Sequence, residues 1–428
     1  MDYQSKNHRI LLIDMNPVTK PYTVYPLGLA MLAEEAKRCG FAPECISWEV
    51  LNRTMRALER ECSHTAVSLV AVSIRNIDNT RGIDTRTYFG TILPYLKVIS
   101  RNFADRCVIG GTGFSLFPDV ILEMSGFNWG VVGRHFEIWR NILDAVNRHI
   151  PLSYLKEMFV IRNKSLLAPE ESRDLASSQL PPLPTGNWFL HSTRWDRVGF
   201  DTQAGCGQRC IYCSYPALSG RKKQYRAAEE VVDYVKRWQE RGQNDFDIVD
   251  DVFNDSIEHA VSCCSTWIAK SLGFRWTAYV RPNEIGRDFA QLLFASGCTE
   301  AVLGVDSLSN KVLAKLQKGF DVQTVESAIC HLKQTGISVA VSLIVGSEFD
   351  TKKTVEETVK NLNLLLPDKI SVQYGLRVLP LTPLAKKLGK NQYDLFMPVF
   401  SVLSDMSLKK AREFFEGLIP KLERRPIA

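Results

Sequence analysis

Residues 201–216 read DTQAGCGQRCIYCSYP, and three of them form a CxxxCxxC pattern: Cys206, Cys210 and Cys213. The candidate strand FDTQAG (200–205) comes just before, so we expect the thiols on the loop that follows it. A structural zinc site usually takes four ligands, and the nearest further one, His191, precedes the strand. Three thiolates on a [4Fe–4S] cluster would leave one iron without a protein ligand. The pattern therefore favours such a cluster over zinc.

Strand and helix patterns alternate from this loop onward. The candidate strands are FDTQAG (200–205), DFDIVDD (245–251), FRWTAYV (274–280), EAVLGVD (300–306), SVAVSLIVG (338–346) and KISVQYGLRV (369–378). A helix-like segment follows each strand except the last. Six βα units predict a partial (β/α)6 barrel whose chemistry lies at the carboxyl ends of its strands.

The first 145 residues show a similar alternation. The candidate strands are ILLIDM (10–15), VSLVAVSI (67–74), CVIGG (107–111) and WGVVG (129–133). Helix patterns at 26–39 and 88–100 separate the first three, which predicts a doubly wound, Rossmann-like α/β domain with a parallel sheet. A ligand is expected at the loops after these strands, 14–25, 75–86, 110–117 and 133–137.

The segment SSQLPPLPTGNW (177–188) is rich in proline, which disfavours helix and central strand alike. We therefore expect four parts: a first domain at 1–145, a connector at 146–195, the barrel at 196–388 and a C-terminal helical cap at 389–428. The cap helix is expected at 407–422.

Composition limits the class of protein. Apolar residues make up 45% and charged residues 23% of the chain, as in soluble globular proteins. The net charge of +6 is spread along the chain, so we expect no nucleic-acid partner. Neither a membrane span nor a leader is visible, which predicts a cytoplasmic protein with reduced thiols and no membrane partner. A basic run, Arg221–Lys223 with Arg226, is either a solvated loop or a docking patch for an acidic electron donor.

The cysteine loop resembles that of the radical S-adenosylmethionine (SAM) superfamily, in which the open iron binds SAM. The likeness extends over roughly 200–385. DDVFN (250–254) resembles the DDxF of cobalamin-dependent members, TAYVRPNEI (277–285) the third strand, and GVDSLSNKVLAKLQKGF (304–320) the GIES…VLK…KG segment. RVLPLTPL (377–384) resembles R-x-x-P-G-T-P-L, with Leu381 where glycine is usual.

The resemblance also implies cofactor contacts in the barrel. Tyr212 stands where an aromatic lies beside the adenine of SAM, and Asp306 with Ser307 would hold its ribose or methionine. Asp251 and Arg281 lie at the barrel mouth. An internal ion pair between adjacent strands stays open as the alternative role of Asp251, Arg281 and Asp306.

The first domain resembles cobalamin-binding domains that precede radical SAM barrels. The matching segments are VYPLGLAMLAEEAKRCGF (24–41), IGGTGFSLFP (109–118) and GVVGRHFE (130–137). In the second, small residues would let the backbone approach the nucleotide tail: Gly110, Gly111, Thr112 and Gly113. A tight turn after a buried strand is the alternative. Gly133 lies in the fourth loop, where Arg134 and His135 depart from the family pattern.

The likeness departs in the first loop, where a DxHxxG motif commonly supplies a histidine to cobalt. Asn16 stands in the place of that histidine, so cobalt should lack a histidine ligand from this loop. Arg75, followed by Asn76, is placed to reach the lower face of the corrin, as in tryptophan-methylating members of the family. A salt bridge from Arg75 to Asp78 or Asp84 is the alternative.

The resemblance implies three cofactors: a [4Fe–4S] cluster, SAM and cobalamin. It also implies a C-methyltransferase acting on a small natural-product or peptide-derived substrate, with the methyl group passing from SAM via methylcobalamin to a substrate carbon. Radical and polar routes both stay open. The alternatives are oxidation, cyclisation or ring rearrangement without methyl transfer, and a non-catalytic cluster-binding subunit. The expected partners are a ferredoxin- or flavodoxin-type electron donor, a small-molecule or carrier-bound substrate, and an accessory protein if the short tail leaves the barrel mouth open.

Overall fold

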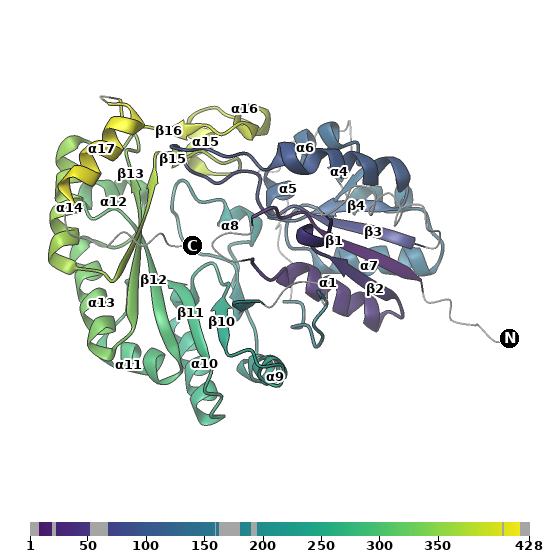
Figure 1. Cartoon of the computed structure of the whole chain (residues 1–428), viewed down its shortest axis with the longest axis horizontal. Helices are drawn as coiled ribbons and strands as arrows, with labels where there is room; N and C mark the ends of the chain where they lie inside the picture. The colour runs from purple at the N-terminus through teal and green to yellow at the C-terminus, as the bar shows by residue number, and fades with distance from the viewer. Residues whose placement is uncertain are drawn as a thin grey trace. The chain divides into compact units, whose positions relative to one another are not determined.

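The computed structural model describes residues 8–18, 23–51, 67–158, 160–161, 180–189, 195–404 and 406–419. The chain forms two compact units, each of which is an α/β structure (Figure 1). Unit 1 comprises Met1–Asn79, Thr87–Trp195 and Gln392–Phe396, and unit 2 comprises Thr80–Arg86, Asp196–Asn391 and Met397–Ala428. The described part of the expected connector 146–195 thus belongs to unit 1. No helix among the described residues is long and apolar enough to span a membrane.

Unit 1 is built on a sheet in the order β2-β1-β3-β4-β5-β6. Its strands are β1 (Arg9–Asp14), β2 (Ala42–Ile46), β3 (Val67–Ser73), β4 (Cys107–Gly110), β5 (Trp129–Gly130) and β6 (Val160–Ile161). All neighbours are parallel except β5 and β6. The order reverses direction at β1, as expected for a doubly wound sheet. The sequence prediction missed β2 and β6, which are short edge elements.

The helices of unit 1 are α1 (Leu27–Arg38), α2 (Trp48–Leu51), α4 (Phe89–Asn102), α5 (Thr112–Leu116), α6 (Pro118–Ser125), α7 (Phe136–Asn147) and α16 (Gln392–Phe396), with a 3-10 helix at Leu152–Met158. The central strand β1 is fully buried from Ile10 to Ile13, which explains its unbroken apolar sequence. The loop expected at 110–117 is largely the helix α5, because the Gly111 carbonyl accepts the amide of Ser115 and starts a helical turn.

Unit 2 has a parallel sheet in the order β14-β13-β12-β11-β10-β7. Its strands are β7 (Val198–Phe200), β10 (Asp245–Ile248), β11 (Arg275–Val280), β12 (Cys298–Asp306), β13 (Ser338–Val345) and β14 (Lys369–Tyr374). Each strand pairs with its successor, and the helices α9 (Ala228–Gln239), α10 (Ile257–Ala269), α11 (Arg287–Ala295), α13 (Val322–Thr335) and α14 (Lys352–Leu365) connect them. Figure 1 shows α10, α11, α13 and α14 along one side of the sheet. This is the parallel sheet predicted for the second half of the chain.

Two predicted strands of unit 2 are broken. The run 200–205 divides into β7 and β8 (Gln203–Ala204), and β8 pairs antiparallel with β9 (Gln224–Tyr225). The run 369–378 ends at Gly375, whose φ of 78° stops the strand before β15 (Leu376–Arg377) pairs with β16 (Phe400–Ser401). The remaining helices are α8 (Tyr215–Leu218), α12 (Asn310–Leu316), α15 (Pro383–Lys387) and α17 (Leu408–Leu418), with a 3-10 turn at Phe253–Asp255.

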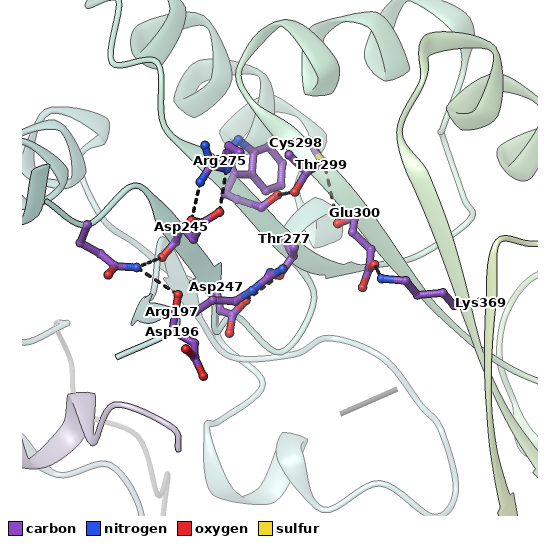
Figure 2. A network of polar contacts seen from close by, with 12 residues as sticks. Asp196, Arg197, Asp245, Asp247, Arg275, Thr277, Cys298, Thr299, Glu300 and Lys369 are labelled. Atoms are coloured by element: carbon purple, nitrogen blue, oxygen red, sulfur yellow. Dashed lines mark hydrogen bonds and ion pairs between the residues drawn. The ribbon is translucent and has the colours of Figure 1, made fainter. Parts of the chain in front are cut away.

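The face of this sheet opposite the helices carries polar side chains that link adjacent strands (Figure 2). Arg197 donates to Asp247 at 3.1 Å and to Thr277 at 3.0 Å. Lys369 forms an ion pair with Glu300. These contacts and the Arg275–Asp245 pair link adjacent strands of the unit 2 sheet, and neither Arg281 nor Asp306 takes part in them.

Candidate functional site

The three cysteines follow β8 on a loop that is attached to the rest of unit 2 by backbone hydrogen bonds. Cys206 is buried, whereas Cys210 and Cys213 are half-buried. The amide of Cys206 donates to the Gly220 carbonyl at 3.0 Å. Between the other two cysteines, Ile211 donates to Leu316 at the end of α12 and accepts from Leu384 in α15. The loop is therefore attached to the rest of unit 2 at Cys206 and again at Ile211.

The thiols lie close enough to influence one another. Burial raises the pKa of Cys206 to about 11 and that of Cys213 to about 12, and neighbouring cysteines add to both effects. Burial also raises the pKa of Cys210. Metal binding would therefore have to displace three protons.

The spacing of these side chains bears on the kind of metal centre. Among the described residues, no three His, Cys, Asp or Glu side chains converge closely enough to hold a single ion. In a [4Fe–4S] cube each cysteine binds a different iron, so the three sulfurs need not meet at one point. Three thiols on one loop are a donor set that such a cluster can take.

Acidic residues after β10 form hydrogen bonds to the backbone just before and within the cysteine loop. The buried Asp250 accepts from the Thr202 amide at 2.7 Å, the Thr202 hydroxyl at 2.6 Å and the Gln203 amide at 3.1 Å. Burial nevertheless raises the pKa of Asp250 to about 7. Asp255 accepts from the Gly207 amide at 3.4 Å and pairs with Lys223 at 3.0 Å. Sequence reasoning missed both roles, although the acid-rich run 250–255 was their signal.

The basic run after the cysteines divides into two kinds of residue. Arg226 is buried and pairs with the buried Asp201 at 2.6 Å, so it belongs to the interior of unit 2. Arg221 and Lys222 are exposed. Arg226 therefore cannot belong to the predicted docking patch.

Asp251, the predicted contact of the barrel mouth, lies near the cysteines. Its carboxylate accepts from the Ser219 hydroxyl at 3.4 Å. It also adds to the raised pKa values of Cys206 and Cys213, whose first cause is burial. A negative charge therefore lies within electrostatic reach of two of the predicted cluster ligands.

Asp306 ends β12 and joins the fourth strand to the cysteine loop. It accepts hydrogen bonds from the Tyr212 hydroxyl and from Lys318 Nζ, the latter at 2.6 Å. Lys318 also donates to the Tyr212 oxygen at 3.2 Å. Burial would lower the pKa of Lys318, but the Asp306 carboxylate and the Cys210 thiol outweigh it and hold the pKa above its ordinary value. Lys318 was missed in the sequence, where it precedes the glycine of the KG pair.

The other predicted contacts of the fourth strand have protein partners as well. The buried Ser307 hydroxyl lies 3.3 Å from the Thr358 hydroxyl and accepts from the Ser309 amide at 3.2 Å. Arg281 donates to the Lys318 carbonyl at 2.7 Å. Asp306 thus forms an internal ion pair, but with Lys318 in the turn after α12 and not with a residue of an adjacent strand. The described ion pairs include none between Arg281 and Asp306. Leu381, where the family usually has glycine, has a φ of 64°.

Unit 1 brings a second polar group together at the carboxyl ends of β1 and β3. The Asn16 carboxamide oxygen accepts from Asn76 at 3.5 Å and from the Val18 amide at 3.4 Å. Burial raises the pKa of Asp14 to about 7, and the Arg75 guanidinium opposes that rise. Arg75 is exposed and forms no ion pair with Asp78 or Asp84 among the described salt bridges. The folded chain thus leaves the guanidinium accessible at this edge.

The glycines of the third loop have a structural explanation in unit 1. Gly111 has a φ of 97°, and a Cβ there would lie 2.5 Å from the Ile74 carbonyl oxygen. At Gly113 a Cβ would lie 3.0 Å from the Arg75 carbonyl oxygen, and at Gly110 it would lie 3.4 Å from that of Val131. The tight-turn alternative therefore accounts for Gly111 and Gly113 without a ligand. Thr112 is exposed at the start of α5.

The fourth loop is connected to the third. Gly133 has a φ of 81°, and its amide donates to the Ser115 hydroxyl of α5 at 2.9 Å. The loops after β4 and β5 therefore lie side by side at the same edge of the unit 1 sheet as Asn16 and Arg75.

Comparisons with known proteins agree with this geometry. Residues 201–362 match the radical SAM superfamily. The tryptophan 2-C-methyltransferase of Streptomyces laurentii is 23% identical, over 89% of this chain and 74% of its own. The anaerobic magnesium-protoporphyrin IX monomethyl ester cyclase of Rubrivivax gelatinosus is 25% identical, over 61% of this chain and 49% of its own.

A solved structure extends the comparison to the fold. TsrM from Kitasatospora setae, a radical SAM methyltransferase with cobalamin and a [4Fe-4S] cluster bound, aligns with a TM-score of 0.78 at 22% identity. The alignment covers 89% of this chain and 77% of the TsrM chain. At this identity the likeness establishes a shared fold. Residues 201–362 thus form a radical SAM domain, and the chain is a radical SAM enzyme.

Proposed function

We propose that the chain is a cobalamin-dependent C-methyltransferase that acts on a small natural-product or peptide-derived substrate. The observation that carries this proposal is the similarity to a tryptophan 2-C-methyltransferase over 89% of the chain, which is more than the radical SAM domain alone. When bound, the cluster would supply an electron or a Lewis-acidic iron to SAM, and cobalamin would carry a methyl group to a substrate carbon.

In unit 2, the chain's own residues hold and orient the reactive groups. Cys206, Cys210 and Cys213 would bind three irons, and the acidic residues after β10 keep the loop in place before any metal arrives. Tyr212 is fixed through its hydroxyl by Asp306 and Lys318, so its ring has a defined position beside the cysteines. Preorganisation of this kind lowers the cost of binding a cofactor.

In unit 1, the residues fit a corrin that receives no imidazole from the first loop. Asn16 occupies the histidine position and is held by Asn76, so this side chain is fixed as an amide. Arg75 presents an exposed positive charge at the same edge. A cation there would disfavour water or a protein base as the lower ligand of cobalt, and it would ease methyl transfer from cobalt.

A second candidate is cobalamin-dependent oxidation or cyclisation without methyl transfer. The similarity to the magnesium-protoporphyrin cyclase, at 25% identity over 61% of the chain, favours it. It uses the same cysteine loop, so the two candidates differ in the product and not in the cluster.

Methyl-labelled SAM separates the candidates. We would reconstitute the chain without oxygen, add cobalamin, Ti(III) citrate and SAM with a trideuterated methyl group, and offer tryptophan and other indoles first. Label in the product together with S-adenosylhomocysteine supports methyl transfer. 5′-Deoxyadenosine with an unlabelled, altered product supports the second candidate. If neither SAM-derived product forms with any substrate, the non-catalytic alternative replaces both.

The cofactors themselves provide a control that needs no substrate. Cys210→Ala should lose the iron–sulfur absorbance and all SAM turnover while it keeps the fold. Cob(II)alamin bound to the wild-type chain should show no nitrogen hyperfine splitting from a lower histidine ligand. Iron–sulfur spectra retained in Cys210→Ala, or no cobalamin binding at all, would count against the proposal.

A further inference from the structure

The inner face of the unit 2 sheet, which is the face opposite the helices, changes in character along the strands. Near the start of the strands lies a lower polar level of paired charges, such as Arg197 with Asp247 (Figure 2). At the end of β12 lies an upper polar level, where Asp306 contacts Tyr212 of the cysteine loop. Between these two levels the inner face carries uncharged side chains.

Tyr279 is the largest of these uncharged side chains. Successive side chains of a strand alternate between its two faces, so Tyr279 lies on the same face as Thr277, whose hydroxyl donates to Asp247 at 2.6 Å. Its strand, β11, has a neighbour on each side, yet 49% of the residue is exposed. Of the described residues, none forms a hydrogen bond with the Tyr279 hydroxyl.

The Tyr279 hydroxyl lies within electrostatic reach of both polar levels. Burial raises its pKa, and the carboxylates of Asp306, Asp247 and Glu300 add to the rise. Asp306 belongs to the upper level, whereas Asp247 and Glu300 belong to the lower one. The hydroxyl therefore stays protonated at neutral pH and is available as a hydrogen-bond donor.

Small residues lie beside Tyr279 on the same face. Tyr279 is in register with Val302, and two residues further along β12 Gly304 is in register with Ser342, which is in register with Ser371. A Cβ at Gly304 would meet no atom within 4 Å. Both serines are half-buried, and no described residue hydrogen bonds to either hydroxyl. There is thus space beside the tyrosine ring, with hydroxyl groups that a ligand could reach.

The charges around this space are already paired. Lys369, in register with Ala340 next to Val302, forms an ion pair with Glu300. Val249, directly after β10, adds an apolar side chain that is 44% exposed. A charged ligand would lose its hydration here without gaining an opposite charge, so the surface favours an uncharged one.

We propose that Tyr279 selects the substrate, and that with Val249, Gly304, Ser342 and Ser371 it contacts a planar, uncharged ring that carries a hydrogen-bond acceptor. The inference rests on the proposed function and names the class of its substrate. The tyrosine ring would pack against the substrate ring, and its hydroxyl would donate to the acceptor. The space beside Gly304 would admit the ring. A site built to form such a hydrogen bond discriminates strongly against a ring that lacks the acceptor.

The test compares the binding of two probes, indole and benzimidazole. Both are planar fused rings of the same size and are uncharged at mildly alkaline pH, but only benzimidazole has a ring nitrogen that accepts a hydrogen bond. Dissociation constants would be measured by ligand-observed NMR on the full chain, reconstituted without oxygen and supplied with cobalamin and SAM. Tyr279→Phe removes the hydroxyl alone, Tyr279→Ala removes the ring, and Gly304→Val fills the space.

Two controls match these variants. Tyr154→Ala removes an exposed tyrosine ring of unit 1. Gly286→Val adds a side chain before α11, at another position of unit 2 where a Cβ meets no atom within 4 Å. Every variant is first checked for an unchanged circular dichroism spectrum and iron–sulfur absorbance, so that a folding defect is not taken for a binding defect.

Tyr279→Phe should weaken benzimidazole binding about fivefold and leave indole binding unchanged. Tyr279→Ala and Gly304→Val should weaken binding of both probes about tenfold, and both controls should bind like wild type. The proposed surface is overturned if wild type binds neither probe, if the Tyr279 and Gly304 variants bind like wild type, or if the controls lose as much. A chain that binds as expected but forms no SAM-derived product contradicts the proposed function instead. A chain that transfers methyl groups with an unchanged kcat/KM in Tyr279→Ala contradicts the surface alone.

Discussion

The ion pair between Lys318 and Asp306 allows a quantitative test that needs no cofactor. Both side chains are buried, and Nζ lies 2.6 Å from the carboxylate oxygen. Lys318→Met removes the positive charge but keeps a long apolar side chain. It leaves Asp306 buried with the Tyr212 hydroxyl as its remaining partner.

The distance sets the scale of the effect. With an effective dielectric constant of about 20, two unit charges at this separation attract by about 6 kcal/mol. Much of that attraction offsets the cost of removing both charges from water, so the pair itself contributes little net stability. Removing one partner leaves the other charge buried, and this typically costs about 3–5 kcal/mol. Asp306→Asn/Lys318→Met, which removes both charges, should recover most of the loss.

The free energy of unfolding should be measured on the cluster-free chain by urea denaturation. Hydrogen exchange of peptides from β12 would report on unit 2 by itself, because a chain of two units need not unfold in one step. Arg275→Met is the matched control, since Arg275 and Asp245 form a 2.5 Å pair on exposed side chains (Figure 2). Solvent screens that pair, so its loss should cost far less.

Two results would refute this reasoning. One is that Lys318→Met lowers the free energy of unfolding by no more than Arg275→Met does. The other is a double variant as unstable as Lys318→Met alone, which would mean that packing of the lysine stem, and not its charge, matters. Either result would also remove the reason to regard Tyr212 as electrostatically fixed.

Three further predictions follow from single residues. Burial raises the pKa of Asp14 from 3.8 to about 7, so the folded state binds this proton more tightly than the unfolded state. As the pH rises from 3.8 to about 7, the free energy of unfolding of wild type should therefore fall by up to about 4 kcal/mol. Asp14→Asn removes that dependence, so its stability relative to wild type, measured by urea denaturation, should rise between pH 5 and pH 8; a constant difference would contradict the burial argument. Gly111→Ala should lower the melting temperature because of the 2.5 Å clash, whereas Gly28→Ala, with open space around it, should not. Asp250→Ala should bind less iron per chain after reconstitution with an unchanged circular dichroism spectrum, because three hydrogen bonds to Thr202 and Gln203, just before the cysteine loop, are lost.

Much of the fold could be predicted because its elements are encoded locally. The apolar runs of β12 and β13 are long, rich in valine and buried, and they match the predicted strands to within two residues. The short elements were harder. The break between β7 and β8, and the helix α5 in place of a loop, depend on a few hydrogen bonds that have no periodic signature.

The predicted site shows the same division. The CxxxCxxC spacing predicts the three cysteines as cluster ligands without any structure, because all three lie within eight consecutive residues. The roles of Asp250 and Lys318 could not be found in that way. Lys318 is 106 positions from Tyr212 in the chain, and only the pairing of the strands brings them together.

By itself, the sequence determined the α/β alternation, the cysteine motif and the presence of Asn16, with no histidine, in the first loop, since each depends on neighbouring residues. Only the tertiary structure decided which charges meet: Arg226 with Asp201 in the interior, Lys318 with Asp306 beside the cysteines, and Arg75 at an exposed edge. The physical reason is that a charged side chain pairs with the group that burial and strand register place within reach. Which groups are within reach is decided only when the chain has folded.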